Sequence, residues 1–272
     1  MMDSLIHKVE SLLRDVAEQE ILTRFQNLQE TDIQHKDDHG HDLVTTADLE
    51  AENRLREGLL KLLPGSHVIG EEGAYKSPDI LQYLHSDKPV WVVDPVDGTR
   101  NFATGKPCFA VIVALVVKGK TQMGWILDPI SDACITARLG FGAYLGTQKL
   151  TLGFPSVDIS DMTGSVGKHV QDRLLKQKTS HLLGHMVRYH CVGREYMDLA
   201  LGKIQYAMYG GKMMPWDHAA GVLIVEECGG FVRSIEEKNR YSAARQGPDQ
   251  RILITPTETA FESLKPLLTN KI

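Results

Sequence analysis

Two aspartates three residues apart, Asp94 and Asp97, are the side chains best placed to carry out chemistry. They follow a short apolar run that starts at Trp91, and its β-branched residues predict a buried strand. Pro95 and Gly98 favour a tight turn directly after this strand. Both carboxylates should therefore lie close together, where they would repel each other unless a hard cation neutralised them. The pattern predicts a magnesium site at the end of the strand.

The residues after Gly98 are suited to binding an anion beside such a metal. A helix that starts at Thr99 would present backbone N–H groups and the positive end of its dipole, which is typical of phosphate sites. The alternative is an ordinary turn, because most Asp-Pro and Asp-Gly pairs in loops have no other role. The density of acids, glycine and hydroxyl in this segment favours a functional site.

The composition is that of an ordinary globular protein. The 272 residues are enough for one large α/β unit or two closely joined subdomains. A net charge of -5 and a pI near 6.1 give no general attraction to nucleic acid or to an anionic membrane. An anionic substrate must therefore be bound by local groups, and binding to nucleic acid or transcription machinery has no support from the charge.

The cysteines and the first residues predict a cytoplasmic protein. The cysteines are widely spaced and include no Cys-x-x-Cys pair, which is typical of a reducing compartment. The N-terminal pattern is amphipathic and carries acids, unlike a signal peptide, and no apolar run reaches membrane-spanning length. The four cysteines are Cys108, Cys134, Cys191 and Cys228.

Elements around the acidic turn must position it. Apolar residues at helical spacing predict a long helix over residues 5–25, followed by a polar loop over residues 31–42. Three histidines of this loop suggest zinc, but no fourth ligand is evident, and a solvated loop is the preferred interpretation. Lys36 in the same loop could reach a phosphate. The histidines are His35, His39 and His41.

Two acidic positions lie next to further predicted elements. Asp48 precedes a second helix over residues 49–62, where an aspartate commonly caps the helix. Val68-Ile69 predicts a short strand that runs into Gly70-Glu71-Glu72-Gly73. Taken alone, a pair of acids flanked by glycines is more often a solvated turn than a site.

The rest of the chain predicts two different sheets. β-rich runs over residues 109–150 indicate a large antiparallel sheet, and alternating strands and helices over residues 151–272 indicate a smaller mixed sheet. Asp217 lies in the first turn of a helix that starts near Trp216, where small residues allow close approach of another backbone or a ligand. The other predicted elements are strands near Ser156 and over residues 186–192, 204–209 and 251–255, and helices over residues 170–183, 195–201 and 257–268.

Three segments in this order carry a family resemblance: Gly70-Glu71-Glu72, Asp94-Pro95-Val96-Asp97-Gly98-Thr99 and Trp216-Asp217-His218-Ala219-Ala220-Gly221. Together they resemble the inositol monophosphatase family of magnesium-dependent, lithium-sensitive phosphatases. The likeness covers nearly the whole chain and includes Asp42-Leu43-Val44-Thr45 and Gly140-Phe141-Gly142-Ala143-Tyr144.

The resemblance implies an α/β (α+β) fold, a layered αβαβα sandwich with a large antiparallel sheet and a smaller mixed one. Residues 1–150 would form a subdomain with most metal ligands, and residues 151–272 a second one with Asp217 and substrate contacts. The implied protein is a homodimeric phosphomonoesterase that hydrolyses inositol monophosphate or a related small phosphate ester.

The resemblance also assigns roles to residues. Two or three magnesium ions would be held by Glu71, Asp94, the carbonyl of Val96, Asp97 and Asp217. Thr99 with Asp48, and Glu71 with its metal, would activate waters. Gly98 and Thr99 would contact phosphate through backbone N–H groups. No protein nucleophile is required for this chemistry.

The departures from the family pattern concern the substrate. Arg194 and Glu195 follow Val192-Gly193, where inositol-selective members usually have Ser or Thr and then Ala. Gly210 stands where those members often have a Glu that reaches inositol hydroxyls. We therefore expect weak discrimination among small phosphomonoesters, with substrate contacts from Arg194, Glu195 and Asp217. Arg194, with Lys212 nearby, could favour a second anionic group; the alternative is a salt bridge between Arg194 and Glu195.

Three other interpretations compete with this one. Haloacid-dehalogenase-type phosphatases open with a similar motif, but their two aspartates are two residues apart rather than three. A phosphatase of this fold could prefer another sugar phosphate or a bisphosphate, such as fructose 1,6-bisphosphate or a nucleotide. A regulatory protein of the same fold could bind transcription machinery without needing the metal ligands, all of which are present here.

Overall fold

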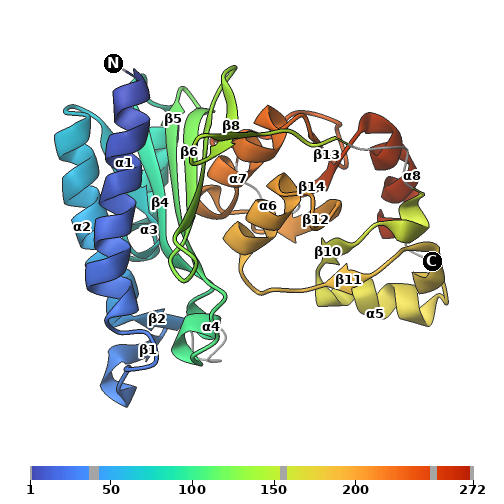
Figure 1. The fold of residues 1–272 in the computed structure, drawn as a ribbon, viewed down its shortest axis with the longest axis horizontal. Coiled ribbons are helices and arrows are strands. Elements are labelled where there is room, and N and C mark those ends of the chain that lie inside the picture. The colour runs from blue at the N-terminus through green and yellow to red at the C-terminus, as the bar shows by residue number, and fades with distance from the viewer. Residues whose placement is uncertain (1, 37–42, 154–157, 246–249, 270–272) are drawn as a thin grey trace.

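The computed structural model describes residues 2–36, 43–153, 158–245 and 250–269, and these form five layers (Figure 1). Helices α1 and α2 cover one face of a seven-stranded sheet, α6 and α7 lie between the two sheets, and α5 and α8 cover the far face of a five-stranded sheet. This is the αβαβα arrangement that the resemblance implied. The helices are α1 (Met2–Val16), α2 (Thr46–Leu62), α5 (Lys168–Lys176), α6 (Val192–Ala200), α7 (Pro215–Glu227) and α8 (Glu258–Thr269).

The larger sheet has its seven strands in sequence order, and every pair is antiparallel except β3 with β4, which is parallel. The sequence predicted antiparallel pairing and missed this exception. The strands are β3 (His67–Gly70), β4 (Val90–Asp97), β5 (Ala110–Val117), β6 (Lys120–Asp128), β7 (Ala133–Arg138), β8 (Gly142–Leu145) and β9 (Gln148–Leu150).

The sequences of β5 and of β4 before Asp94 are continuously apolar because both faces of these strands are buried. Val111 and Val113 pack in the core under α1 and α2, whereas Ile112 and Ala114 pack in the core under α6 and α7. Alternate residues therefore fill different cores, as the two-residue period of a strand requires. The acidic residues at the end of β4 are thus fixed on a strand that is packed from both sides.

The smaller sheet is mixed, as predicted. Strand β10 pairs in parallel with β11 and β12, and β14 pairs antiparallel with β12 and β13. The strand order is β11-β10-β12-β14-β13. The strands are β10 (Gly164–Val166), β11 (Met186–Val187), β12 (Tyr206–Gly211), β13 (Phe231–Ser234) and β14 (Gln250–Thr255).

Several predicted bounds in this half were wrong. The helix expected over residues 170–183 ends at Lys176 and is followed by a separate 3-10 turn, Ser180–Leu182. The strand expected over residues 186–192 is only β11, because α6 already begins at Val192. Strand β13 was not predicted, and the strand expected near Ser156 lies outside the described residues.

The first half also departs from expectation in its short elements. α1 continues as a π-helical segment (Ala17–Leu22), within the predicted long helix. The predicted polar loop starts with a 3-10 turn (Glu30–Asp32) and strand β1 (Ile33–His35), which pairs with β2 (Leu43–Thr45). His35 is exposed on β1; His39 and His41 lie outside the described residues. The remaining elements are α3 (Glu71–Lys76), a 3-10 segment (Pro78–His85), α4 (Thr99–Ala103) and a 3-10 turn (Ile159–Asp161).

The small residues at the start of α7 serve close packing between the layers. A Cβ atom placed on Gly124 of β6 would lie 2.9 Å from the Cα atom of Ala220. A Cβ atom placed on Gly221 would lie 2.1 Å from the ring of Tyr196 on α6. The partners of these small residues are therefore a strand backbone and an aromatic ring of the chain itself.

In the part of the chain that the structure describes, no helix is long and apolar enough to cross a membrane. All four cysteines are free thiols. The larger sheet lies within residues 1–150 and the smaller one within residues 151–272, while α6 and α7 pack on the larger sheet. The division into two subdomains at residue 150 stays a prediction.

Candidate active site

A bulge at the end of β4 brings the two aspartates to the same face of the sheet. Asp94 pairs with Ile112 of β5 and Asp97 pairs with Ala110, so three steps along β4 match two steps along β5. In a regular strand, residues three apart point to opposite faces. The extra residue corrects this, so both aspartates lie on the face whose side chains include Ile112 and Ala110.

Gly98 ends the strand in a conformation that favours glycine. Its φ is +89°, in the left-handed region, and α4 begins at the next residue. A Cβ atom here would lie 3.0 Å from the carbonyl oxygen of Cys108 and 3.2 Å from the Cβ atom of Cys191. Gly98 therefore lets segments from both halves of the chain meet at the turn.

Thr99 and Asp48 are in contact, as the predicted pairing requires. The Thr99 hydroxyl lies 3.1 Å from Oδ1 of Asp48 and 3.0 Å from the carbonyl oxygen of Val96. Oδ2 of Asp48 accepts hydrogen bonds from the backbone N–H (2.8 Å) and hydroxyl (2.5 Å) of Thr45, so Asp48 also has the helix-capping role. Burial raises the pKa of Asp48 to about 6, against the lowering effect of the bonds from Thr45.

Asp97 is held by the start of α6. Its Oδ2 atom accepts a hydrogen bond from the backbone N–H of Gly193 (2.6 Å), and Cys191 Sγ lies 3.0 Å from the same atom. Burial raises the pKa of Asp97, while these hydrogen bonds lower it. An acid at a helix N-terminus is electrostatically favoured, so this arrangement stabilises the carboxylate in a buried position.

Asp94 lies at the centre of an acidic cluster. It is buried, and its Oδ1 atom accepts a hydrogen bond from the backbone N–H of Val96 at 3.1 Å. Its pKa is raised well above the usual value, first by burial and then by nearby negative charges. The carboxylates that contribute these charges are Glu71, Asp97, Asp217 and Asp48.

Lys36 supplies a positive charge at the edge of this cluster. Its Nζ atom lies 2.7 Å from Oε1 of Glu71 and 2.7 Å from Oε1 of Glu72, and its side chain is only 3% exposed. The two carboxylates raise the pKa of Lys36 although burial opposes this. Burial, together with the charge of Glu71, raises the pKa of Glu72 to about 8. Lys36 thus lies just after β1, outside the regular elements as expected, and it contacts carboxylates of the predicted site; its contact with phosphate stays a prediction.

Glu52 fixes the position of Glu71 and was missed in the sequence. Its side chain, on α2, accepts hydrogen bonds from the backbone N–H groups of Glu72 (2.8 Å) and Gly73 (2.9 Å) and so caps the start of α3. A Cβ atom on Gly70 would lie 2.1 Å from the Glu52 carboxyl carbon. The Gly-Glu-Glu-Gly segment is therefore a capped helix start, and its interpretation as a solvated turn was wrong.

Asp217 reaches the cluster from the first turn of α7. It is partly buried, and its charge contributes to the raised pKa of Asp94. The next residue, His218, is buried, and its Nδ1 atom lies 3.0 Å from the Tyr196 hydroxyl. Burial lowers the pKa of His218 to about 3, so its imidazole is neutral near pH 7. His218 therefore adds no charge to this turn at neutral pH.

Arg194 and Glu195 point to different partners. Arg194 donates to Oδ2 of Asp128 (2.6 Å) and lies 3.6 Å from Asp198. Glu195 is buried and accepts hydrogen bonds from the Tyr209 hydroxyl (2.8 Å) and the backbone N–H of Tyr189 (3.3 Å). The alternative of a salt bridge between the two neighbours was therefore wrong, and substrate contact by either residue stays a prediction.

The donor set of the cluster fits a hard divalent cation. Glu71, Asp94, Asp97 and Asp217 offer carboxylate oxygens, the ligands that magnesium prefers, and the repulsion that raises the pKa of Asp94 is the kind that a cation relieves. Among the described residues, no three acidic, histidine or cysteine side chains converge as a ready-made metal-binding group. Lys36 instead pairs with Glu71 in this arrangement.

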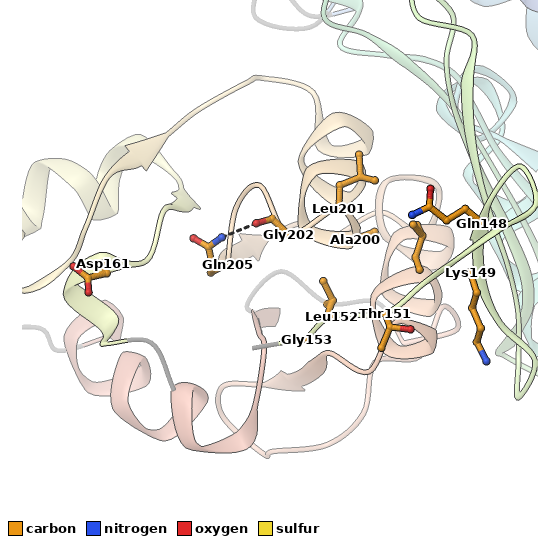
Figure 2. Close-up of a pocket in the computed structure, with 11 residues that line it drawn as sticks. Gln148, Lys149, Thr151, Leu152, Gly153, Asp161, Ala200, Leu201, Gly202 and Gln205 are labelled. Atoms are coloured by element: carbon orange, nitrogen blue, oxygen red, sulfur yellow. Dashed lines mark hydrogen bonds between the residues drawn. The ribbon is translucent and has the colours of Figure 1, made fainter. Parts of the chain in front are cut away.

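A pocket of about 660 Å³ lies away from this cluster (Figure 2). It is bounded by residues 148–153, by the end of α6 and by Gln205, whose side chain donates a hydrogen bond to the carbonyl of Gly202 at 2.8 Å. None of the predicted site residues lines it. The acidic cluster therefore remains the candidate active site.

Comparison with known proteins identifies relatives over most of the chain. The model of the "Inositol monophosphatase family" matches residues 2–270. Inositol monophosphatase 1 of Solanum lycopersicum is 31% identical over 198 residues, covering 70% of this chain and 71% of the relative. The Nus factor SuhB of Haemophilus influenzae is 32% identical over 234 residues, covering 84% and 83%.

Two further matches bear on substrate and fold. The fructose-1,6-bisphosphatase/inositol-1-monophosphatase of Thermotoga maritima is 27% identical over 212 residues, covering 74% of this chain and 75% of the relative. Among solved structures, the Thermotoga maritima IMPase TM1415 superposes with a TM-score of 0.80 at 20% identity, covering 95% and 94% of the two chains. The structural match shows the fold.

Proposed function

This chain belongs to the inositol monophosphatase family and is a phosphoric monoester hydrolase, and on that premise we propose that it is a magnesium-dependent phosphatase of inositol monophosphate or a related small phosphate ester. One observation carries the proposal: Asp94 is fully buried, and the charges of four other carboxylates raise its pKa. Carboxylates gathered around a buried one repel each other, and a bound cation would relieve this repulsion, which supports metal binding.

In this proposal, two or three magnesium ions would be held by Glu71, Asp94, the carbonyl of Val96, Asp97 and Asp217. Bound there, magnesium would supply Lewis-acid chemistry, which makes a bound water a better nucleophile and stabilises negative charge on the leaving group. The backbone N–H groups of Gly98 and Thr99 bind the phosphate.

Thr99 and Asp48 orient the attacking water. A threonine hydroxyl has one proton and two lone pairs. When it donates that proton to Asp48 at 3.1 Å, its lone pairs remain available to accept a hydrogen bond from water. Asp48 is itself fixed by Thr45, so the hydroxyl is held by a rigid acceptor. Glu71 is positioned by the hydrogen bonds that Glu52 accepts from the start of α3. With its metal, Glu71 would activate another water.

We propose a broad substrate range. Gly210 offers no side chain to ring hydroxyls, and the relative from Thermotoga maritima is named for both fructose 1,6-bisphosphate and inositol 1-monophosphate. Both facts favour several small phosphomonoesters over a single inositol ester.

The test is phosphate release from a panel of phosphomonoesters, with magnesium and after treatment with EDTA. We expect hydrolysis of inositol 1-phosphate and of other small esters that is absolutely dependent on magnesium. Lithium at millimolar-range concentrations should inhibit, as the family resemblance implies. Equal turnover in EDTA would overturn the metal proposal, and no phosphate release from any ester would overturn the substrate class.

Acid quenching with labelled substrate separates water attack from the dehalogenase-type alternative. Direct attack by water leaves no covalent intermediate, so neither Asp94 nor Asp97 should carry label. A stoichiometric acyl phosphate on either residue would favour the alternative.

A second candidate function rests on one relative, the Haemophilus influenzae protein named as a Nus factor. We propose binding to transcription machinery as an additional role that does not need hydrolysis. An Asp94→Asn variant should then retain partner binding while losing activity.

The family resemblance also implies a homodimer, and we propose this state for the chain. Light scattering after gel filtration tests it.

A further inference from the structure

A second cavity, of about 960 Å³, lies at the end of the larger sheet opposite the acidic cluster. Its wall includes Pro89, directly before β4, whereas Asp97 is the last residue of that strand. The start of α1, the end of α2 and the hairpin between β5 and β6 surround the cavity. None of the residues assigned to the phosphatase lines it, so its function is a separate question.

The strand register explains the apolar wall. Leu115 pairs with Met123, and Met123 pairs with Arg138, so these three side chains share one face of the sheet. Val117 lies on the same face and pairs with Lys120. Further along β5 and β6 this face is covered by the core under α1 and α2. Near the hairpin, Leu5 of α1 and Leu62 of α2 form the sides of the cavity instead.

The charged residues of the cavity all have the same sign. Lys8, Lys118, Lys120 and Arg138 line it, and no acidic side chain is among its lining residues in the described part of the chain. Lys118 lies 3.2 Å from Asp87, with both side chains largely exposed, and the Arg138 guanidinium lies 3.6 Å above the ring of Phe141. In a chain with a net charge of -5, this is a local basic site.

We propose that this cavity binds a free medium-chain fatty acid. Its aliphatic wall fits an acyl chain, and its lysines complement a carboxylate. The volume lies within the range of about 300–1,000 Å³ that is typical of small-molecule sites. The acyl chain lies against Leu62, Leu115 and Val117, and the carboxylate lies among the lysines.

Isothermal titration calorimetry with the full chain tests the proposal, with decanoate as the probe. We expect saturable binding with one decanoate per chain. Decyltrimethylammonium has the same tail and the opposite charge, so it should bind at least about tenfold more weakly. Equal affinity for the two amphiphiles would overturn the charge argument.

Two sets of variants locate the site. Lys8→Glu combined with Lys120→Glu should weaken decanoate binding by roughly tenfold or more, because two attractive charges become repulsive. Lys176→Glu combined with Lys265→Glu makes the same charge change on α5 and α8 and should leave the affinity unchanged. Val117→Trp fills the cavity from its wall and should abolish binding.

Circular dichroism and phosphate release show whether each variant is folded, since none of these residues belongs to the phosphatase site. Unchanged decanoate binding in both the charge-reversed and the filled variants would place the fatty acid elsewhere and overturn the proposal. Sedimentation with phosphatidylglycerol vesicles, without binding of decanoate, would also overturn it in favour of a membrane surface.

Discussion

The thiol sulfur of Cys191 lies 3.0 Å from Oδ2 of Asp97, although 94 residues separate them in the chain. The same oxygen accepts the backbone N–H of Gly193 at 2.6 Å. A proposed metal ligand of the first half is therefore oriented by the first turn of α6 in the second half. The position of Asp97 therefore depends on the packing between the larger sheet and the start of α6.

Replacing Cys191 by alanine should lower kcat/KM by about two- to tenfold, because one hydrogen bond to a buried carboxylate is lost. Cys191→Ser retains a donor and should be closer to the wild type. Steady-state kinetics at saturating magnesium measure both. Cys228→Ala is the matched control, because that buried thiol lies at the end of α7. Equal losses for Cys191→Ala and Cys228→Ala would indicate a general packing effect.

Asp94→Asn should reduce turnover by on the order of a hundredfold or more while the protein stays folded, since the amide keeps the shape but removes a central charge. In EDTA the thermal midpoint should not fall, because the substitution relieves repulsion among buried carboxylates. Kinetics and thermal unfolding check the two parts. Asp79→Asn is the control, because Asp79 is an exposed residue of the 3-10 segment that follows α3. Near wild-type turnover of Asp94→Asn would show that the metal assignment is wrong.

Thr99→Val should lower kcat by about ten- to a hundredfold with little change in KM, because the hydroxyl bonded to Asp48 is removed at nearly constant volume. Thr99→Ser keeps the hydroxyl and is the control for loss of the methyl group. The comparison of kcat for the two variants measures the role of the hydroxyl. A loss confined to KM would assign Thr99 to substrate binding alone.

Lys36→Met should lower the thermal midpoint in EDTA, because the carboxylates of Glu71 and Glu72 lose the ammonium that lies 2.7 Å from both. Magnesium should then raise the midpoint by more than it does in the wild type, since no lysine competes for Glu71. Thermal unfolding across a magnesium titration measures both effects. Lys76→Met, on an exposed residue of α3, is the control. An unchanged response to magnesium would mean that Lys36 and the metal do not share Glu71.

The features that the sequence predicted well depend on local signals. The apolar run before Asp94 predicted a buried strand, and the residues around Asp217 predicted a helix start, and both elements are present. The contact between Thr99 and Asp48 came from the family resemblance, which encodes a long-range relation that spacing cannot give. The two sheets followed from the change of pattern near residue 150.

The features that the sequence did not predict depend on contacts between distant segments. In the sequence, Glu52 is an ordinary acidic residue of an amphipathic helix. Its role depends on the backbone N–H group of Glu72 at the start of α3, 20 residues later in the chain. The role of Cys191 likewise depends on the packing of the start of α6 against the end of β4, which brings its thiol next to Asp97. The parallel pairing of β3 with β4 depends on the connection through α3 and the 3-10 segment, which sequence patterns did not resolve. Each missed feature is a relation between elements rather than a property of one.

The last prediction concerns substrate selectivity at Gly210. The values of kcat/KM for inositol 1-phosphate, glycerol 2-phosphate, a nucleoside monophosphate and fructose 1,6-bisphosphate should lie within about a hundredfold, because each missing hydrogen bond to a ring hydroxyl is worth only about 0.5–1.5 kcal/mol. Gly210 contributes no such bond, and its position is covered by Arg251: a Cβ atom here would lie 2.7 Å from Cγ of that side chain.

Gly210→Glu should raise the preference for inositol 1-phosphate over glycerol 2-phosphate by about two- to tenfold, since the new carboxylate can accept a hydrogen bond from a ring hydroxyl. The flexible side chain of Arg251 has to shift, which opens its 2.6 Å contact with Glu236 and is the reason for expecting a moderate gain. Gly210→Leu displaces Arg251 equally but cannot accept a hydrogen bond, so it should not change the ratio. An equal change in both variants would attribute selectivity to the movement of Arg251, and a wild-type preference above a hundredfold for the inositol ester would contradict the proposed broad range.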